Sequence, residues 1–428
     1  MINSRERVNL ALQHREPDRI PLDLGGTTVT GMHVSTVYKL RQALRLDEPG
    51  TPVKVIEPYQ MLGEIKPDLI AALGTDVVGL MGTGTPFGFK LEGWKEWKAF
   101  DGTPTLVPAG FNTVPEPNGD LLLYPQGDRS CPASGRMPRG GFYFDVIPRP
   151  EPFDESKLRL EDNLEEYQPI SNLELEYLGV EFRKLYSETD KAIVVNAGVM
   201  GIGSISRIPG PSLKHPKGIR DIEEFCISLN TRPEFIRSMF EAQTEINLAN
   251  LQKVYQVVGD QASAIYMTGT DFGAQNGPFI SPRIYRDLFL PFHKILNDWV
   301  HQHTSWKTFI HSCGSVRALV EDFIAAGFDI LNPVQCSAAN MDPTELKTKF
   351  GDRITFWGGG VDTQRTLPFG TREDVRNEVR ERLRAFGPGG GFVFNGVHNI
   401  QSLVPVENVI EMYKTAREDG GYPLSIGA

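Results

Sequence analysis

Short apolar segments alternate with amphipathic segments along most of this chain, and that alternation constrains the fold more than any other feature. Continuous apolar strands separated by helices indicate a parallel sheet with helices packed on its outside. Eight such strands match the number in a (β/α)8 barrel of the TIM type. The candidate strands are residues 20–24, 76–80, 192–196, 264–268, 308–311, 329–332, 354–358 and 391–394.

The segments between the later strands have helical patterns. Residues 316–326 place their apolar side chains on one face, and residues 343–350 and 372–386 have the pattern of charged amphipathic helices. The alternative is an open, doubly wound sheet, but no Gly-x-Gly-x-x-Gly follows an early strand. We therefore expect an α/β fold, with one (β/α)8 barrel domain over residues 1–428.

One region interrupts this alternation. Residues 82–166 are rich in glycine and proline and contain short aromatic and β-branched pieces. This composition predicts a β-rich inserted subdomain between barrel strands. We expect it to pack over the barrel mouth or against a second chain, which would make a homodimer; the alternative is a purely structural elaboration.

Composition and charge exclude several classes of protein. The net charge of −10 disfavours a nucleic-acid backbone as partner. No apolar run approaches the roughly 20 residues that span a bilayer, and no apolar stretch follows the charged N-terminus as in a signal peptide. The four cysteines show no disulfide-framework spacing, which favours free thiols or metal ligands. We expect a cytoplasmic protein without membrane contact.

The motif His311-Ser312-Cys313-Gly314 follows the apolar run at 308–310 and predicts a strand that ends in a loop. A neutral imidazole and a thiolate two residues apart suit Zn²⁺, which prefers nitrogen and sulfur ligands. The motif alone is weak, because a buried thiol beside a hydrogen-bonded histidine gives the same pattern.

Other polar residues stand at the predicted strand ends, where a (β/α)8 barrel places its chemistry. Barrel closure brings the ends of the last four strands around one mouth, so we predict that His311, Cys313, Cys336 and His398 converge there as metal ligands. The same reasoning proposes two carboxylates as site acids or bases, and three amides as substrate-binding or ligand-orienting groups: Asp23 and Asp271; Asn196, Asn332 and Gln335.

The chain resembles the uroporphyrinogen decarboxylase and cobalamin-dependent methyltransferase superfamily over nearly its whole length. The resemblance is carried jointly by residues 4–8 and 16–21, by Ile280-Ser281-Pro282 with Pro291-Phe292-His293, by the motif at 311–314, and by residues 392–401. It implies a (β/α)8 barrel, in agreement with the strand count.

The two branches of this superfamily differ in chemistry. The resemblance to the decarboxylase branch implies no metal and an arginine-rich segment near the N-terminus, but residues 25–30 here are Gly-Gly-Thr-Thr-Val-Thr. The methyltransferase branch implies Zn²⁺ held by a His-x-Cys, matched by His311 and Cys313, and by a cysteine after the last strand. At that position this chain has His398, which puts the methylation of a thiol in doubt.

The replacement at 398 changes the charge of the expected site. A His, Cys, Cys set neutralises Zn²⁺, whereas His311, Cys313 and His398 leave a net charge of +1 and a stronger Lewis acid; participation of Cys336 would restore neutrality. We therefore expect a zinc-dependent methyltransferase that moves a methyl group between a small donor and a corrinoid on a partner protein. The alternative is a lyase that decarboxylates a carboxylated substrate through Asp271 and Asp23 without corrinoid.

Overall fold

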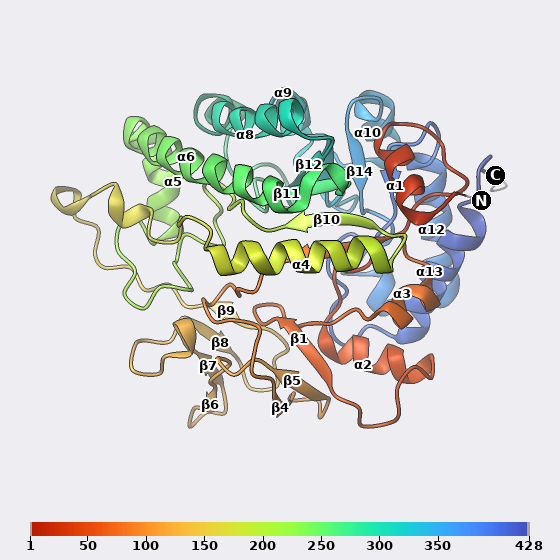
Figure 1. Cartoon of the computed structure of the whole chain (residues 1–428), viewed down its shortest axis with the longest axis horizontal. Coiled ribbons are helices and arrows are strands. Elements are labelled where there is room, and N and C mark those ends of the chain that lie inside the picture. The colour runs from red at the N-terminus through yellow and green to blue at the C-terminus, as the bar shows by residue number, and fades with distance from the viewer. Residues whose placement is uncertain (1, 426–428) are drawn as a thin grey trace.

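Seven parallel strands form the curled central sheet of the protein, which is seen here in a computed structural model that describes residues 2–425 (Figure 1). Their order in the sheet is β15-β14-β13-β12-β11-β10-β3, and each pair is parallel. The bounds are β3 (Val77–Met81), β10 (Ala192–Asn196), β11 (Ala264–Thr268), β12 (Lys307–His311), β13 (Ile330–Asn332), β14 (Thr355–Trp357) and β15 (Phe392–Val393).

The segment around Leu22 closes the sheet into a barrel without being a strand itself. Leu22 forms a single parallel bridge with Phe394, and its carbonyl accepts a hydrogen bond of 2.7 Å from the Asp76 N–H on the other side. The prediction of a strand at 20–24 is therefore wrong, although this segment lies between β15 and β3, where the eighth barrel strand would be. Pro21 has no N–H to donate, and the Asp76 carboxylate takes the Leu22 N–H at 2.9 Å, so a regular ladder does not form here.

Helices surround the barrel on its outside. On one side of the barrel each helix contacts the next in the series α4, α6, α8 and α9. On the other side the series is α10, α12, α13 and α2 (Figure 1). The bounds are α1 (Ser4–Leu12), α2 (Val34–Ala43), α3 (Pro67–Leu73), α4 (Asn172–Glu188), α5 (Ile222–Thr231), α6 (Pro233–Val258), α7 (Pro282–Ile284), α8 (Leu290–His303), α9 (Val320–Ala325), α10 (Pro343–Phe350), α11 (Thr366–Phe369), α12 (Arg372–Phe386) and α13 (Val406–Asp419). The α/β barrel expected from the sequence is confirmed.

The barrel interior is packed with side chains and is closed at one end by a helix. Val77, Val194, Phe309 and Trp357 belong to one buried cluster inside the sheet, and they come from four different strands. The apolar side of α1 joins the same cluster, and α1 contacts β3, β10 and β15. The amino ends of the strands are thus plugged, which leaves the carboxyl ends as the accessible mouth.

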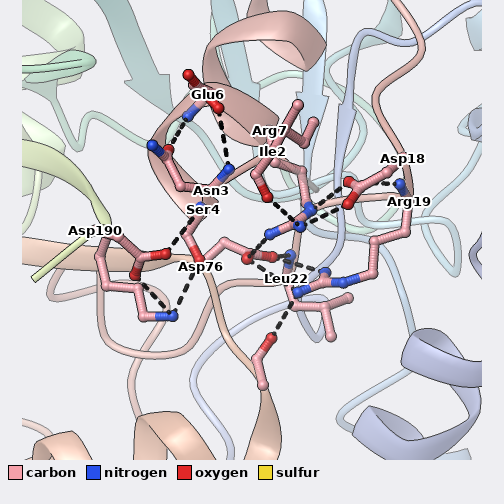
Figure 2. Close-up of polar contacts among 12 residues, drawn as sticks. Ile2, Asn3, Ser4, Glu6, Arg7, Asp18, Arg19, Leu22, Asp76 and Asp190 are labelled. Atoms are coloured by element: carbon pink, nitrogen blue, oxygen red, sulfur yellow. Dashed lines mark hydrogen bonds and ion pairs between the residues drawn. The ribbon is translucent and has the colours of Figure 1, made fainter.

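Arginine–aspartate pairs surround α1 at the plugged end (Figure 2). The Asp76 carboxylate has no exposed surface and pairs with Arg7 and Arg19, each at 2.7 Å. Arg7 also reaches Asp18 at 2.6 Å. These contacts tie α1 and the Leu22 segment to the start of β3.

Two further sheets lie beside the barrel, at the lower side of Figure 1. One has the order β2-β1-β5-β4 and the other β6-β7-β8-β9. Their bounds are β1 (Val53–Glu57), β2 (Leu62–Gly63), β4 (Lys95–Lys98), β5 (Pro104–Val107), β6 (Val114–Pro115), β7 (Leu121–Leu123), β8 (Gly135–Met137) and β9 (Asp145–Val146). The expected β-rich insertion follows β3, and its first sheet also recruits β1 and β2 from before that strand. We propose that residues 82–166 act as one subdomain.

No helix among residues 2–425 combines the length and the apolar character that crossing a bilayer would require.

Candidate metal centre and its cavity

His311 ends β12 with its ring held in one orientation. Its Nδ1 lies 2.6 Å from Asn332 Oδ1, and Asn332 Nδ2 donates to the Trp357 carbonyl at 2.8 Å. Because the amide nitrogen of Asn332 is used as a donor, its oxygen must accept, so His311 carries its proton on Nδ1. The lone pair is therefore on His311 Nε2, which contacts Cys313 Sγ and can bind a metal in place of that contact.

Cys313 is placed by the loop that follows His311. Its Sγ lies 3.3 Å from His311 Nε2, and its N–H donates to Asp271 Oδ1 at 2.7 Å. Burial, followed by the negative charge of Asp271, raises the pKa of the Cys313 thiol. The thiol is therefore protonated unless a cation displaces the proton, so metal binding at Cys313 would release that proton.

Gly314 gives this loop its sharp turn. Its φ is +83°, and a Cβ there would come within 2.5 Å of the Gly273 carbonyl group. Its N–H donates to Gln335 Oε1 at 2.9 Å. The glycine of the motif is thus required by the close approach of two loops, and Gln335 fixes the backbone next to Cys313.

His398 arrives from the loop after β15 and completes a group of three. Its ring centroid lies 5.3 Å from that of His311, and ligand atoms of His311, Cys313 and His398 all lie within 4.8 Å of one another. Burial, with a smaller contribution from His311, lowers the pKa of His398 to about 3. All three side chains can therefore present a lone pair to one cation.

Cys336 does not join this group within the described part of the chain. Its Sγ lies 3.5 Å from the Val334 carbonyl oxygen. Burial raises the pKa of the Cys336 thiol to about 12, and the charged groups that act on it are led by Arg382 and Glu378 of α12. The sequence placed Cys336 at the mouth because it follows β13, but the loop turns it toward the outer helices.

A cavity of about 1900 Å³ extends from the carboxyl ends of the strands along α4 as far as Asp190 and Lys191, which precede β10. It is bordered by His311 and His398, by Asp271 from the loop after β11, and by Asn196 at the end of β10. Tyr143 of the β-rich insertion borders the same space. The candidate metal centre therefore opens into a cavity whose whole volume exceeds the roughly 300–1,000 Å³ that small-molecule sites commonly measure.

The two predicted carboxylates occupy different environments. Asp271 is half-buried, borders the cavity, and has its Oδ1 3.8 Å from His311 Nε2. Asp23 is fully buried and does not border the cavity: its oxygens accept hydrogen bonds from Gly26 N at 2.9 Å and Trp357 Nε1 at 2.8 Å. Burial raises the pKa of Asp23 to about 6. The geometry brings Asp271 alone to the reacting space.

Of the three predicted amide residues, only one borders the cavity. Asn332 and Gln335 orient His311 and the Gly314 backbone, and neither borders the cavity. Asn196 does border it, with Nδ2 donating to Gly26 O at 2.9 Å and Oδ1 buried without a hydrogen bond. A ligand donor directed at Asn196 Oδ1 would satisfy that atom.

Glu57 and Arg207 are among the charged residues of the cavity wall that the sequence reasoning did not predict. Glu57 ends β1, is 6% exposed, and accepts hydrogen bonds from the N–H groups of Tyr59 and Gln60; burial raises its pKa to about 7. Arg207 stands on the long loop after β10. The β1 sheet was not foreseen, and a single arginine in a glycine-rich loop carries no signal of its own.

The protein is a (β/α)8 barrel with a three-residue candidate metal centre at the carboxyl ends of its strands, and comparison with known proteins identifies the family. The sequence profile of the uroporphyrinogen decarboxylase (URO-D) family matches residues 161–419, more than half of the chain. The protein belongs to this family, which confirms the resemblance seen in the sequence.

Individual relatives are distant. A uroporphyrinogen decarboxylase from Trichodesmium erythraeum (strain IMS101) is 25% identical over 289 residues, which cover 66% of this chain and 74% of the relative. A second, from Pseudoalteromonas atlantica (strain T6c / ATCC BAA-1087), is 29% identical over 150 residues, covering 32% of this chain and only 39% of the relative.

A solved structure of a methyltransferase from Methanosarcina mazei is similar in fold over nearly the whole chain. The TM-score is 0.55 at 15% identity, and the match covers 98% of this chain and 99% of that one. At that identity the likeness concerns the fold alone.

Proposed function

We propose that this protein is a zinc-dependent methyltransferase that moves a methyl group between a small methyl donor and a corrinoid carried by a partner protein. The observation that carries the proposal is the group of His311, Cys313 and His398, whose ligand atoms lie within 4.8 Å of one another at the edge of the cavity. The fold shared with a methyltransferase supports the proposal.

The three residues fit zinc by their chemistry. Two imidazoles and one thiolate are typical zinc ligands, and three protein ligands leave a fourth position open for a substrate. The set carries one negative charge, so bound zinc would act as a Lewis acid toward the heteroatom that holds the methyl group. The hydrogen bond between His311 and Asn332 would keep the ring aligned toward the ion.

Other residues of the chain would prepare the donor for transfer. Asp271 borders the cavity beside the centre and can hold or accept a proton there, while its Oδ1 fixes the Cys313 backbone. The wall contributed by Tyr143 and its neighbours in the insertion would exclude water from the donor. The volume of about 1900 Å³ leaves room for the corrinoid to approach from the open side.

The alternative is a lyase that decarboxylates a carboxylated substrate. The names of the relatives favour it, since the two relatives described above are named uroporphyrinogen decarboxylases. Against it, residues 25–30 contain no arginine, and one of its two expected carboxylates, Asp23, is enclosed in hydrogen bonds away from the cavity.

The test is single-turnover methylation of a Co(I) corrinoid by the zinc-loaded protein with a panel of methyl donors, followed by the change in corrinoid absorbance. We expect at least one donor to methylate the corrinoid in a zinc-dependent reaction. Release of CO₂ from a carboxylated substrate, without corrinoid methylation by any donor, would establish the lyase instead.

The charge of the centre can be tested with His398→Cys, which adds a second thiolate. This variant should keep zinc and lose donor demethylation by about tenfold or more, which corresponds to about 1.4 kcal/mol in the barrier. The measurement is the same single-turnover rate beside the zinc content of each sample. An unchanged rate in a zinc-loaded variant would show that ligand charge does not set the activity.

A further inference from the structure

Arg207 presents a guanidinium group to the cavity without a protein partner. The residue is exposed, borders the same cavity as His311 and His398, and uses its backbone N–H to bond Ser204 O at 2.9 Å. Within residues 2–425 no hydrogen bond or ion pair of its guanidinium is found. By contrast Lys54, on the same wall, lies 3.9 Å from Glu64.

The loop that carries Arg207 is fixed by buried side chains. Asn247, which is 1% exposed, accepts from Met200 N at 3.0 Å and donates to Met200 O at 2.9 Å. Tyr167 donates to Gly201 O at 2.8 Å, and Thr270 donates to Ile202 O at 3.1 Å. A loop held by three buried side chains presents its next residues at a defined place, which lowers the entropic cost of binding a ligand there.

Two hydroxyl groups lie beside the guanidinium in sequence and border the same cavity. Ser204 and Ser206 have their Oγ atoms 3.1 Å apart. A guanidinium fork with neighbouring hydroxyl donors has the chemistry that binds a carboxylate, because the fork can donate two parallel hydrogen bonds.

The charges around Arg207 leave its positive charge without a contacting counter-charge. Two carboxyl groups lie nearby: both oxygens of Glu57 accept backbone N–H groups, and both oxygens of Glu166 accept from Arg220 Nη1. The pKa of Tyr266 is raised by burial and then by Asp271, and it is lowered by Arg207, so this phenol lies within electrostatic range of both. Tyr266 borders the same cavity as Arg207, Asp271 and His311.

We propose that Arg207, assisted by Ser204 and Ser206, binds the carboxylate of the methyl donor, so that the donor is a small organic acid whose methyl group lies at its other end. Tyr59, Tyr167 and Tyr266 border the same cavity and suit contact with an aromatic ring. That the ligand is a methyl donor rests on the proposed function. That the site binds a carboxylate rests only on the residues of the cavity.

The test compares two probes of nearly equal shape, 4-methoxybenzoate and 4-methoxybenzamide, by isothermal titration calorimetry on the full chain. The wild type should bind the carboxylate at least tenfold more tightly than the amide, with or without added zinc. Arg207→Gln should lose that preference, and Arg207→Lys should recover part of it because the charge returns without the fork. Lys184→Gln is the matched control, since Lys184 is an exposed cation that borders the same cavity from the C-terminal part of α4.

The proposal of this subsite is overturned if the wild type binds both probes equally or binds neither. It is also overturned if Lys184→Gln loses the preference for the carboxylate as much as Arg207→Gln does. Displacement of the benzoate by an equal concentration of inorganic phosphate would also overturn it, because the site would then be a general anion site. If the probes behave as expected but no donor methylates a corrinoid, the subsite stands and the proposed function falls. If methylation proceeds equally well in Arg207→Gln, the subsite falls and the proposed function stands.

Discussion

The two ends of the barrel hold their charged groups in opposite ways. At the amino end, Arg7, Arg19 and Asp76 form closed ion pairs around a carboxylate with no exposed surface (Figure 2). At the carboxyl end, His398 and Arg207 border an open cavity, and neither side chain makes a hydrogen bond within residues 2–425. The buried ion pairs of the amino end stabilise the folded chain, whereas side chains without a protein partner at the carboxyl end are available to ligands. The residues that stabilise the fold are therefore different from those that would bind a ligand.

The largest effect should come from breaking the closed end. Asp76→Asn leaves Arg7 and Arg19 facing a neutral group in a buried place, and we expect the free energy of unfolding to fall by about 3–5 kcal/mol. Urea denaturation measures this loss, and zinc content per folded chain should not change. Asp190→Asn is the control at the same end, because that side chain is 52% exposed and its pair with Lys191 should contribute less than about 1 kcal/mol. Equal losses in both variants would contradict the assignment of stability to the Asp76 pairs.

The pH dependence of stability should also differ in sign between the two ends. The pKa of Glu57, at the cavity, is raised by burial to about 7, so the folded chain keeps this proton between pH 4.5 and 7 while the unfolded chain loses it. Stability from this group therefore falls as pH rises through that window, by up to about 1.4 kcal/mol per pH unit. Arg7 lowers the pKa of Asp18 at the amino end, so the stability from that pair is present above the ordinary aspartate pKa and is lost as pH falls below it.

Glu57→Gln removes the titration at the cavity. The stability of this variant relative to the wild type should rise steadily between pH 4.5 and 7 and stay level above pH 7. Chemical denaturation at a series of pH values gives the slope, with Glu64→Gln as the control for a carboxylate at a more exposed position of the same wall. A difference between Glu57→Gln and wild type that does not vary with pH would show that Glu57 is ionised throughout.

A smaller effect is expected from the residue that orients the metal ligand. Asn332→Ala removes the acceptor of His311 Nδ1, and zinc affinity should fall about ten- to a hundredfold. Competition with a chromophoric chelator measures the affinity. Asn408→Ala is the control, because Asn408 is 3% exposed and bonds Leu367 O and Gly370 O away from the centre. A loss of affinity shared by both variants would assign the effect to general destabilisation.

Much of the barrel was predictable because parallel strands buried on both faces are continuous apolar runs. Strands β10 and β11 have the predicted bounds, and β3, β12, β13, β14 and β15 differ from the prediction by one residue at one or both ends. The segment at 20–24 failed because Pro21 and the Asp76 carboxylate replace ladder hydrogen bonds, which apolar periodicity does not detect. Strand β1 was missed because it pairs with the insertion and not with the barrel.

The candidate centre was predictable to the extent that strand order fixes position. His311, Cys313 and His398 follow the ends of β12 and β15, and closure of the barrel brings those ends to one mouth. Cys336 follows β13 by the same rule, yet its loop turns the thiol toward α12, and the direction of a loop side chain is set by packing that the sequence alone does not reveal. Arg207 depends on a loop held by Asn247, Tyr167 and Thr270, three residues distant in sequence.

The most direct test of the metal centre at the open end is zinc analysis of three proteins: the wild type, Cys313→Ala and Cys336→Ala. Both variants remove a largely buried thiol, but only one thiol belongs to the group of three. We expect about one zinc per chain in the wild type and in Cys336→Ala, with a Zn–S distance of about 2.3 Å by X-ray absorption, and almost none in folded Cys313→Ala. Wild-type protein that neither contains nor takes up zinc, or equal zinc in both variants, would contradict the account.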